Sequence, residues 1–170
     1  MQRVLVVGSS GAGKSTLSRR LAERLHLPLI SLDAEFWQPG WVETPRPMWR
    51  VKVTALAAAS RWIMDGNYSG SFDLRMPRAD AVIWLDYGRG LCLRRALWRA
   101  LMHHGRRRSE MAEGCPERLD FVFLRYIWSF PAAHRPKIVA AIEAFCAHAQ
   151  VFRLGNDRDA DRLLAGIEDA

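Results

Sequence analysis

Long hydrophobic runs are missing from this chain of 170 residues, and cysteine is scarce. No apolar stretch approaches the ~20 residues that a helix needs to cross a bilayer. No apolar leader precedes the first candidate strand, so no signal peptide is expected. The three cysteines, Cys92, Cys115 and Cys146, have neither metal-ligand spacing nor the even number of a disulfide framework. We therefore expect a reducing, cytoplasmic location without membrane association.

Acidic residues are the minority charge, with 18 Asp and Glu against 25 Lys and Arg. The resulting net charge of +7 and pI of about 10 suit a polyanionic partner, either a nucleotide or a nucleic acid. Apolar residues make up 49% of the chain, which excludes a disordered protein. The length fits one domain with a full core, so we predict that residues 1–170 form a single domain.

The most informative stretch that is present runs from Gly8 to Thr16 and reads Gly-Ser-Ser-Gly-Ala-Gly-Lys-Ser-Thr. It follows an apolar run and opens a helical pattern, which is the setting of the phosphate-binding P-loop, G-x-x-x-x-G-K-[ST]. The alternative is a glycine-rich turn that happens to precede Lys-Ser. Glycines let successive N–H groups converge at a helix N-terminus, where an anion is stabilised. The residues predicted to bind the phosphates are Gly8, Ser10, Gly11, Ala12, Gly13, Lys14, Ser15 and Thr16.

Two cofactors follow from this motif. Lys14 supplies a positive charge for the β- and γ-phosphates of ATP, and the Ser15 hydroxyl can ligate Mg²⁺. Helical and strand patterns alternate along the rest of the chain. Strands are predicted over 3–7, 29–32, 61–64, 81–85 and 151–154, and helices over 14–25, 44–60, 90–104, 119–129, 135–148 and 159–165. We therefore predict a three-layer α/β fold, with a five-stranded parallel sheet, helices on both faces and a small lid.

Three carboxylates follow predicted strands and so are expected at the carboxyl edge of the sheet, where ligands bind in such folds. Asp65 and Asp86 each end an apolar run, and either could hold the water shell of Mg²⁺. Each could equally cap a turn or a helix. Asp33 is predicted to contact either the phosphate acceptor, whose hydroxyl it could orient or deprotonate, or metal-bound water; the alternative is an N-cap. Thr44 is predicted to be the N-cap of the next helix, with Pro45 in its first turn.

Arginines and tryptophans are the other candidate site residues. Phosphoryl transfer depends on positioning and on neutralising charge. We expect two or three arginines to contact phosphate, and the rest to form a solvated basic face. Residues 105–117 are the predicted lid, and residues 34–60 an acceptor-side helical region, whose tryptophans either line an acceptor pocket or pack in the core or lid. The arginines in or beside the lid are Arg94, Arg95, Arg99, Arg106, Arg107, Arg108 and Arg135; the aromatic residues are Phe36, Trp37, Trp41 and Trp49.

The chain resembles the adenylate-kinase-like P-loop kinases, and among them the small bacterial topology-modulation proteins. The similarity rests on the P-loop, Leu32-Asp33, the segments 62–69 and 80–86, the Gly114-Cys115-Pro116-Glu117 turn and Arg135-Pro136-Lys137. It implies that Asp65-Gly66 corresponds to the Asp-Gly pair of nucleotide kinases, so that Asp65 joins Ser15 at the metal.

The resemblance has further consequences for the site. It implies that Gly155 and Asn156 belong to the loop that recognises adenine. Asn67-Tyr68-Ser69 replaces the Phe-Pro-Arg of nucleotide kinases, so the arginine that binds the acceptor nucleotide is missing, and Arg75 is a candidate substitute. The lid lacks the cysteines of zinc-bearing lids, because Cys115 alone cannot hold a metal.

These observations favour an ATP-dependent phosphotransferase that moves the γ-phosphate to a small acceptor, of which a nucleotide is one candidate. The predicted catalytic residues are Lys14, Asp33, Asp65, Arg95, Arg99, Arg106 and Arg135. The alternative is an ATP-binding regulatory protein that affects DNA topology or gene expression, and a weaker third is an ATPase switch. No helix-turn-helix, zinc module or stacking platform is evident, so nucleic acid is the weaker candidate partner. The expected assembly is a monomer or a homodimer.

Overall fold

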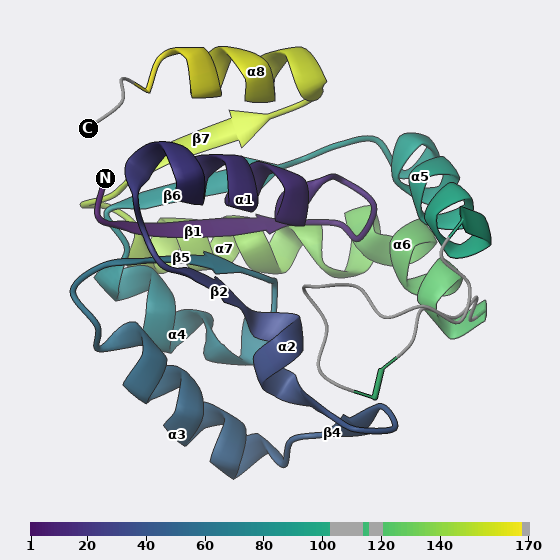
Figure 1. The fold of residues 1–170 in the computed structure, drawn as a ribbon, viewed down its shortest axis with the longest axis horizontal. Coiled ribbons are helices and arrows are strands. Elements are labelled where there is room, and N and C mark those ends of the chain that lie inside the picture. The colour runs from purple at the N-terminus through teal and green to yellow at the C-terminus, as the bar shows by residue number, and fades with distance from the viewer. Residues whose placement is uncertain (103–113, 116–120, 168–170) are drawn as a thin grey trace.

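A five-stranded parallel sheet forms the centre of the protein, in the order β2-β5-β1-β6-β7 (Figure 1). The computed structural model describes residues 1–102, 114–115 and 121–167. Each strand bound lies within one residue of its prediction. The strands of this sheet are β1 (Arg3–Gly8), β2 (Leu29–Ser31), β5 (Trp62–Asp65), β6 (Ala81–Leu85) and β7 (Gln150–Leu154). The predicted fold class is therefore confirmed.

Helices cover both faces of the sheet because alternate strand residues point to opposite sides. On β1, Val4 and Val6 pack in one core with α1 and α8, whereas Leu5 and Val7 pack in a second core with α4 and α7. Figure 1 shows α1 on one side of the sheet and α7 on the other. The longer helices are α1 (Lys14–Leu25), α3 (Arg46–Ala57), α5 (Arg89–Met102), α6 (Phe121–Ala133), α7 (Arg135–Phe145) and α8 (Asp157–Ala165).

Two local predictions about the segment after β2 are wrong. Leu32 begins a short helix, α2 (Leu32–Phe36), rather than ending the strand. Thr44 is not the N-cap of α3, because Pro45 holds that position and the Thr44 hydroxyl donates a hydrogen bond to the Phe36 carbonyl instead. The elements that the sequence patterns did not predict are the hairpin of β3 (Trp37–Gln38) and β4 (Val42–Glu43), the helix α4 (Phe72–Arg75), and the turns η1 (Ser69–Ser71) and η2 (Met76–Arg78).

Most of the predicted lid, including Arg106, Arg107 and Arg108, lies outside the described residues. Its described part, Gly114 and Cys115, lies against the β3–β4 hairpin. The Gly114 carbonyl accepts a hydrogen bond of 3.1 Å from the Gly40 N–H, and the buried Cys115 Sγ lies 3.3 Å from the Gln38 carbonyl. The described helices include none that is both long and apolar enough to cross a membrane.

Candidate functional site

The P-loop joins the end of β1 to the start of α1, as predicted. Gly13 precedes the helix in a left-handed conformation, with φ of 94°, so the first turn of α1 opens on the loop. Gly11 has φ of 82°, and a Cβ built on it would lie 2.2 Å from the Cys92 carbonyl oxygen. Only glycine fits there, because the first turns of α5 pack directly against the loop.

Two cations border this loop. The Lys14 Nζ donates a hydrogen bond of 3.2 Å to the Ser9 carbonyl, which holds the ammonium across the loop. A Cβ built on Gly13 would find Arg95 Nη1 as its nearest neighbour, at 3.9 Å. The loop therefore has positive charge at its rim, which suits an anionic ligand.

Arg95 also connects the P-loop to the predicted adenine loop. Its guanidinium forms an ion pair of 2.5 Å with Asp157, which raises the pKa of Arg95 and lowers the pKa of Asp157. The preceding residue, Asn156, caps α8 by accepting a hydrogen bond of 3.2 Å from the Asp159 N–H. The Asp159 carboxylate accepts a further bond of 2.8 Å from the Gly155 N–H. The fold thus brings Arg95, Gly155 and Asn156 together.

Asp65 ends β5 beside β1 and is 5% exposed. It is paired with Val6 in the sheet, and the following Gly66 N–H donates to the Val6 carbonyl at 3.1 Å. Asp65 shares its side of the strand with Ile63, which packs in the core that contains α1. Its carboxylate therefore lies on the face of the sheet that carries α1 and the P-loop.

This placement fits a magnesium ion. A serine hydroxyl at the start of α1 and a carboxylate on the same face are the hard oxygen donors that Mg²⁺ prefers, and Mg²⁺ takes few protein ligands because it keeps several waters. The described residues contain no cluster of three or more His, Cys, Asp or Glu that could hold a metal by itself. The donor set thus requires phosphate oxygens and water to complete it.

Asp86, the other candidate carboxylate, is engaged by two arginines. It accepts hydrogen bonds of 2.7 Å from Arg135 and 2.6 Å from Arg153, and its side chain is 12% exposed. Both guanidinium groups also lie over the ring of Trp84, at 5.9 and 5.0 Å. The structure thus places Arg135, a predicted catalytic residue, in an ion-paired cluster on the α7 side of the sheet.

Asp33 lies at the start of α2 and accepts a hydrogen bond of 2.7 Å from the Tyr68 hydroxyl. The ring of Tyr68 packs against Phe36 and Trp49, with centroid distances of 4.7 and 5.0 Å. Burial, followed by the charge of Asp33, raises the pKa of Tyr68 well above its usual range. Tyr68 therefore remains protonated and can donate to the carboxylate throughout the neutral pH range.

Asn67 contacts the P-loop directly. Its side-chain oxygen accepts a hydrogen bond of 2.9 Å from the Gly8 N–H, and its amide nitrogen donates to the Gly8 carbonyl at 2.7 Å. The same amide donates to the Tyr126 hydroxyl of α6 at 3.1 Å. In the sequence, Asn67 and Tyr68 belonged to a segment that carries the resemblance and departed there from Phe-Pro-Arg, but no periodicity or spacing could indicate these contacts.

Arg75 does not substitute for an acceptor-binding arginine. Its side chain is fully buried, and it donates to the carbonyls of Gly66, Asn67 and Tyr68. Burial lowers the pKa of Arg75 to about 9. The guanidinium thus supports the turn after β5 from beneath, and it has no exposed surface with which to bind a substrate.

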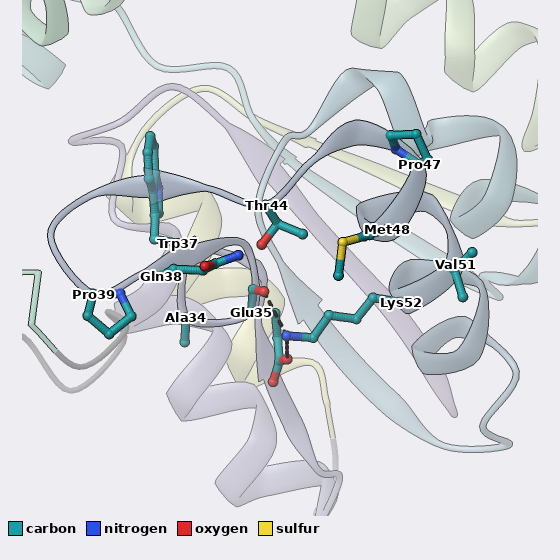
Figure 2. Close-up of a pocket in the computed structure, with 10 residues that line it drawn as sticks. All are labelled: Ala34, Glu35, Trp37, Gln38, Pro39, Thr44, Pro47, Met48, Val51 and Lys52. Atoms are coloured by element: carbon teal, nitrogen blue, oxygen red, sulfur yellow. Dashed lines mark hydrogen bonds and ion pairs between the residues drawn. The ribbon is translucent and has the colours of Figure 1, made fainter.

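The tryptophans divide between packing and a cavity. Trp49 is buried against Leu32 and Val53, whereas Trp37 packs on Trp41 beside Cys115. A cavity of about 720 Å³ lies between α2, the β3–β4 hairpin and α3 (Figure 2). Its lining residues are Ala34, Glu35, Trp37, Gln38, Pro39, Thr44, Pro47, Met48, Val51 and Lys52.

The lining of this cavity sets it apart from the P-loop. Lys52 and Glu35 form an ion pair of 2.6 Å within the lining, and the lining includes neither Asp33 nor a P-loop residue.

Arg99, one helical turn after Arg95, lies 5.9 Å from the ring of Phe123 on α6 and so faces that helix. The catalytic residues predicted from the sequence are therefore only partly gathered around the P-loop.

Comparisons with solved structures give the fold. Shikimate kinase from Acinetobacter baumannii, solved with shikimate, aligns with a TM-score of 0.61 at 19% identity, over 98% of this chain and 90% of that one. A sugar kinase from Janibacter sp. aligns with a TM-score of 0.51 at 19% identity, over 100% of this chain and 96% of that one. These similarities show the P-loop kinase fold.

Sequence comparison identifies the family. No curated protein matches the chain. The model of the AAA domain matches residues 4–109, which include the P-loop, Asp33, Asp65 and Asp86. That match covers more than half of the sequence, and the chain therefore belongs to the AAA domain family.

Proposed function

We propose that this protein is an ATP-dependent phosphotransferase that moves the γ-phosphate of ATP to a hydroxyl group of a small acceptor. The observation that carries the proposal is that a phosphate-binding loop and two carboxylates lie at one edge of the sheet. The P-loop with Lys14 would bind the phosphates, Asp65 lies on the same face of the sheet, and Asp33 follows the neighbouring edge strand. A protein that only bound nucleotide would not need a carboxylate in the position of Asp33.

The residues would divide the chemistry as follows. Lys14 and Arg95 neutralise phosphate charge, and Ser15 and Asp65 hold Mg²⁺, which supplies charge stabilisation at the phosphates. Asp33 orients the acceptor hydroxyl and takes its proton. The acceptor oxygen then bonds to the γ-phosphorus while the bond from that phosphorus to the bridging oxygen breaks, which releases ADP. Arg99, Arg106 and Arg135 are further candidates for charge neutralisation.

Two observations support a hydroxyl acceptor in particular. The fold is that of a shikimate kinase and a sugar kinase, whose names denote hydroxyl-bearing substrates. In addition, Asp33 already accepts a hydrogen bond from a hydroxyl, that of Tyr68.

We also propose how the chain is organised. Residues 34–60 form the acceptor side of a single domain, and residues 105–117 form a lid. Within the P-loop kinases, we propose that the chain belongs with the topology-modulation proteins.

The test is a screen of sugars, other small alcohols and nucleotides as acceptors, scored by ADP release from MgATP above the rate without acceptor. We expect at least one hydroxyl-bearing compound to raise the rate more than tenfold, and Asp33→Asn to abolish that increase while MgADP still binds. MgADP binding without stimulation by any compound would instead favour a nucleotide-dependent regulatory protein.

A further inference from the structure

The dipeptide Asn67-Tyr68 touches both halves of the candidate site, and neither residue has a role in the proposed chemistry. We infer that Asn67 and Tyr68 are positioning residues, Asn67 for the nucleotide loop and Tyr68 for the Asp33 carboxylate. This inference rests on the proposed function and adds to it how donor and acceptor sites are kept in register.

Asn67 binds the backbone of the first P-loop residue at both of its polar groups. Gly8 donates to the side-chain oxygen at 2.9 Å and accepts from the side-chain nitrogen at 2.7 Å. Gly8 has φ of 146°, and a Cβ there would lie 2.5 Å from the Leu85 carbonyl oxygen, so the position carries no side chain that could hold it. A side-chain amide carries both a donor and an acceptor, so it can make both bonds without a charge. Asn67 therefore sets where the P-loop starts.

Tyr68 holds Asp33 by a hydrogen bond to a carboxylate, which is among the stronger contacts that a neutral side chain makes. Its backbone has φ of 39°, a left-handed conformation that is rare for a residue with a large side chain. Ser71 donates to the Tyr68 carbonyl through its N–H and its hydroxyl, both at 2.9 Å, and the buried Arg75 donates to the same carbonyl. The surrounding structure thus maintains an unfavourable backbone geometry, which directs the hydroxyl at Asp33.

A rigid connection follows from the adjacency of these two residues. Because the turn is held from below by Arg75, Asn67 cannot move relative to Tyr68 without breaking contacts of a fully buried guanidinium. Asn67 binds Gly8 and Tyr68 binds Asp33, so the peptide unit that joins Asn67 to Tyr68 sets the distance between Gly8 and Asp33. Positioning of this kind matters because a misplacement of about 1 Å between reacting groups can cost on the order of 100-fold in rate.

The experiment separates the two roles with MgADP binding, measured by calorimetry, and with MgATP hydrolysis, in which water is the acceptor. Asn67→Ala should weaken MgADP binding at least tenfold. Tyr68→Phe should leave the MgADP dissociation constant within twofold of wild type and lower kcat for hydrolysis about tenfold. Asn67→Asp, which keeps the acceptor for the Gly8 N–H but repels its carbonyl, should also weaken MgADP binding.

Ile138→Val is the control for a loss of stability alone, because Ile138 is buried in the core on the α7 side of the sheet and has no role in the candidate site. It should lower the melting temperature without changing either the MgADP affinity or kcat. The double variant Asp33→Asn, Tyr68→Phe should be no slower than Asp33→Asn alone, since a positioning residue acts only through its partner.

Equal losses of affinity and kcat in Asn67→Ala and Tyr68→Phe, or additive losses in the double variant, would overturn the inference and assign both residues a merely structural role. These outcomes require that wild-type protein binds MgADP. Failure of the wild type to bind MgADP would reject the proposed function, and the inference with it.

Discussion

Arg135 and Asp86 form an ion pair of 2.7 Å, and Arg153 binds the same carboxylate oxygen, Oδ2, at 2.6 Å. The pair thus engages one of the two carboxylates that the sequence offered for Mg²⁺. Asp65, in contrast, lies on the face of the sheet that carries α1. Asp65 ends β5 and Asp86 follows β6, the two strands that flank β1 in the sheet. The two carboxylates lie on opposite faces of the sheet, and their expected roles therefore differ.

The first prediction compares these two carboxylates. Asp65→Asn should raise the Mg²⁺ concentration needed for half-maximal ATP turnover by at least tenfold, because the amide replaces a charged oxygen donor. Asp86→Asn should leave that concentration unchanged and lower stability by about 1 kcal/mol, since its arginine partners are 41% and 57% exposed. A magnesium titration and urea unfolding of both variants provide the comparison, and an altered Mg²⁺ requirement in Asp86→Asn alone would contradict it.

The second prediction concerns Lys14. Lys14→Ala removes a charge-assisted contact to the β- and γ-phosphates, which is worth about 1.5–3 kcal/mol. ATP affinity or turnover should fall at least tenfold, while the melting temperature changes little because the Lys14 ammonium donates its hydrogen bond to the Ser9 carbonyl of its own loop rather than to the core. Calorimetry with MgADP and thermal unfolding test both statements. Wild-type affinity and turnover in a folded Lys14→Ala protein would reject the P-loop as the nucleotide site.

The third prediction uses the close approach of Gly11 to α5. Gly11→Ala places a Cβ 2.2 Å from the Cys92 carbonyl and forces alanine into a left-handed backbone. We expect a loss of stability of about 2 kcal/mol or more, together with loss of nucleotide binding, because loop and helix must separate. Gly70→Ala is the control, since a Cβ on Gly70 meets nothing within 4 Å. Equal melting temperatures of the two variants would contradict the packing described.

The fourth prediction is a pH dependence. The pKa of Tyr68 is raised in the folded protein above its usual 10.0. The folded protein therefore holds the Tyr68 hydroxyl proton more tightly than the unfolded chain does. The stabilising contribution is complete below pH 10 and is lost above it, at about 1.4 kcal/mol per pH unit. Burial of Arg75 acts in the opposite direction above pH 9, so only a comparison isolates Tyr68.

Urea unfolding of wild type and Tyr68→Phe at pH 7, 9 and 10.5 makes this comparison. The difference in unfolding free energy between the two proteins should be constant from pH 7 to 9 and should shrink at pH 10.5. A difference that stays constant over the whole range would show that Tyr68 titrates normally in the folded state.

The fifth prediction separates the kinase from a DNA-binding protein. With a net charge of +7, some retention on DNA is expected at low salt through counterion release. We expect this binding to be independent of sequence, to fade as salt approaches physiological strength, and to be competed by MgATP. Filter binding across a salt series tests it. Tight, sequence-selective binding that resists salt, together with an acceptor screen that finds nothing, would favour the regulatory alternative.

The sequence by itself determined the sheet and the phosphate loop, because both depend on local patterns. Short apolar runs that alternate with helical patterns are enough to indicate the strands, and the P-loop combines glycines, lysine and a helix start within nine residues. The same local reasoning was wrong at Thr44, where two alternative hydrogen bonds were available and the tertiary contact with Phe36 decided between them.

Only the tertiary structure decided which side chains meet across the sheet edge. The fold places Arg75 beneath the turn after β5, Arg135 on Asp86, Asn67 on Gly8 and Tyr68 on Asp33, and the two residues of each of the last three pairs are separated by 35 to 59 positions in the chain. Hydrogen bonds of this kind have no periodicity, because they depend on how loops approach one another after the strands have paired. The composition and the P-loop therefore indicated a basic, phosphate-binding protein. Tertiary packing determined which arginines are buried, which are ion-paired and which remain available to a ligand.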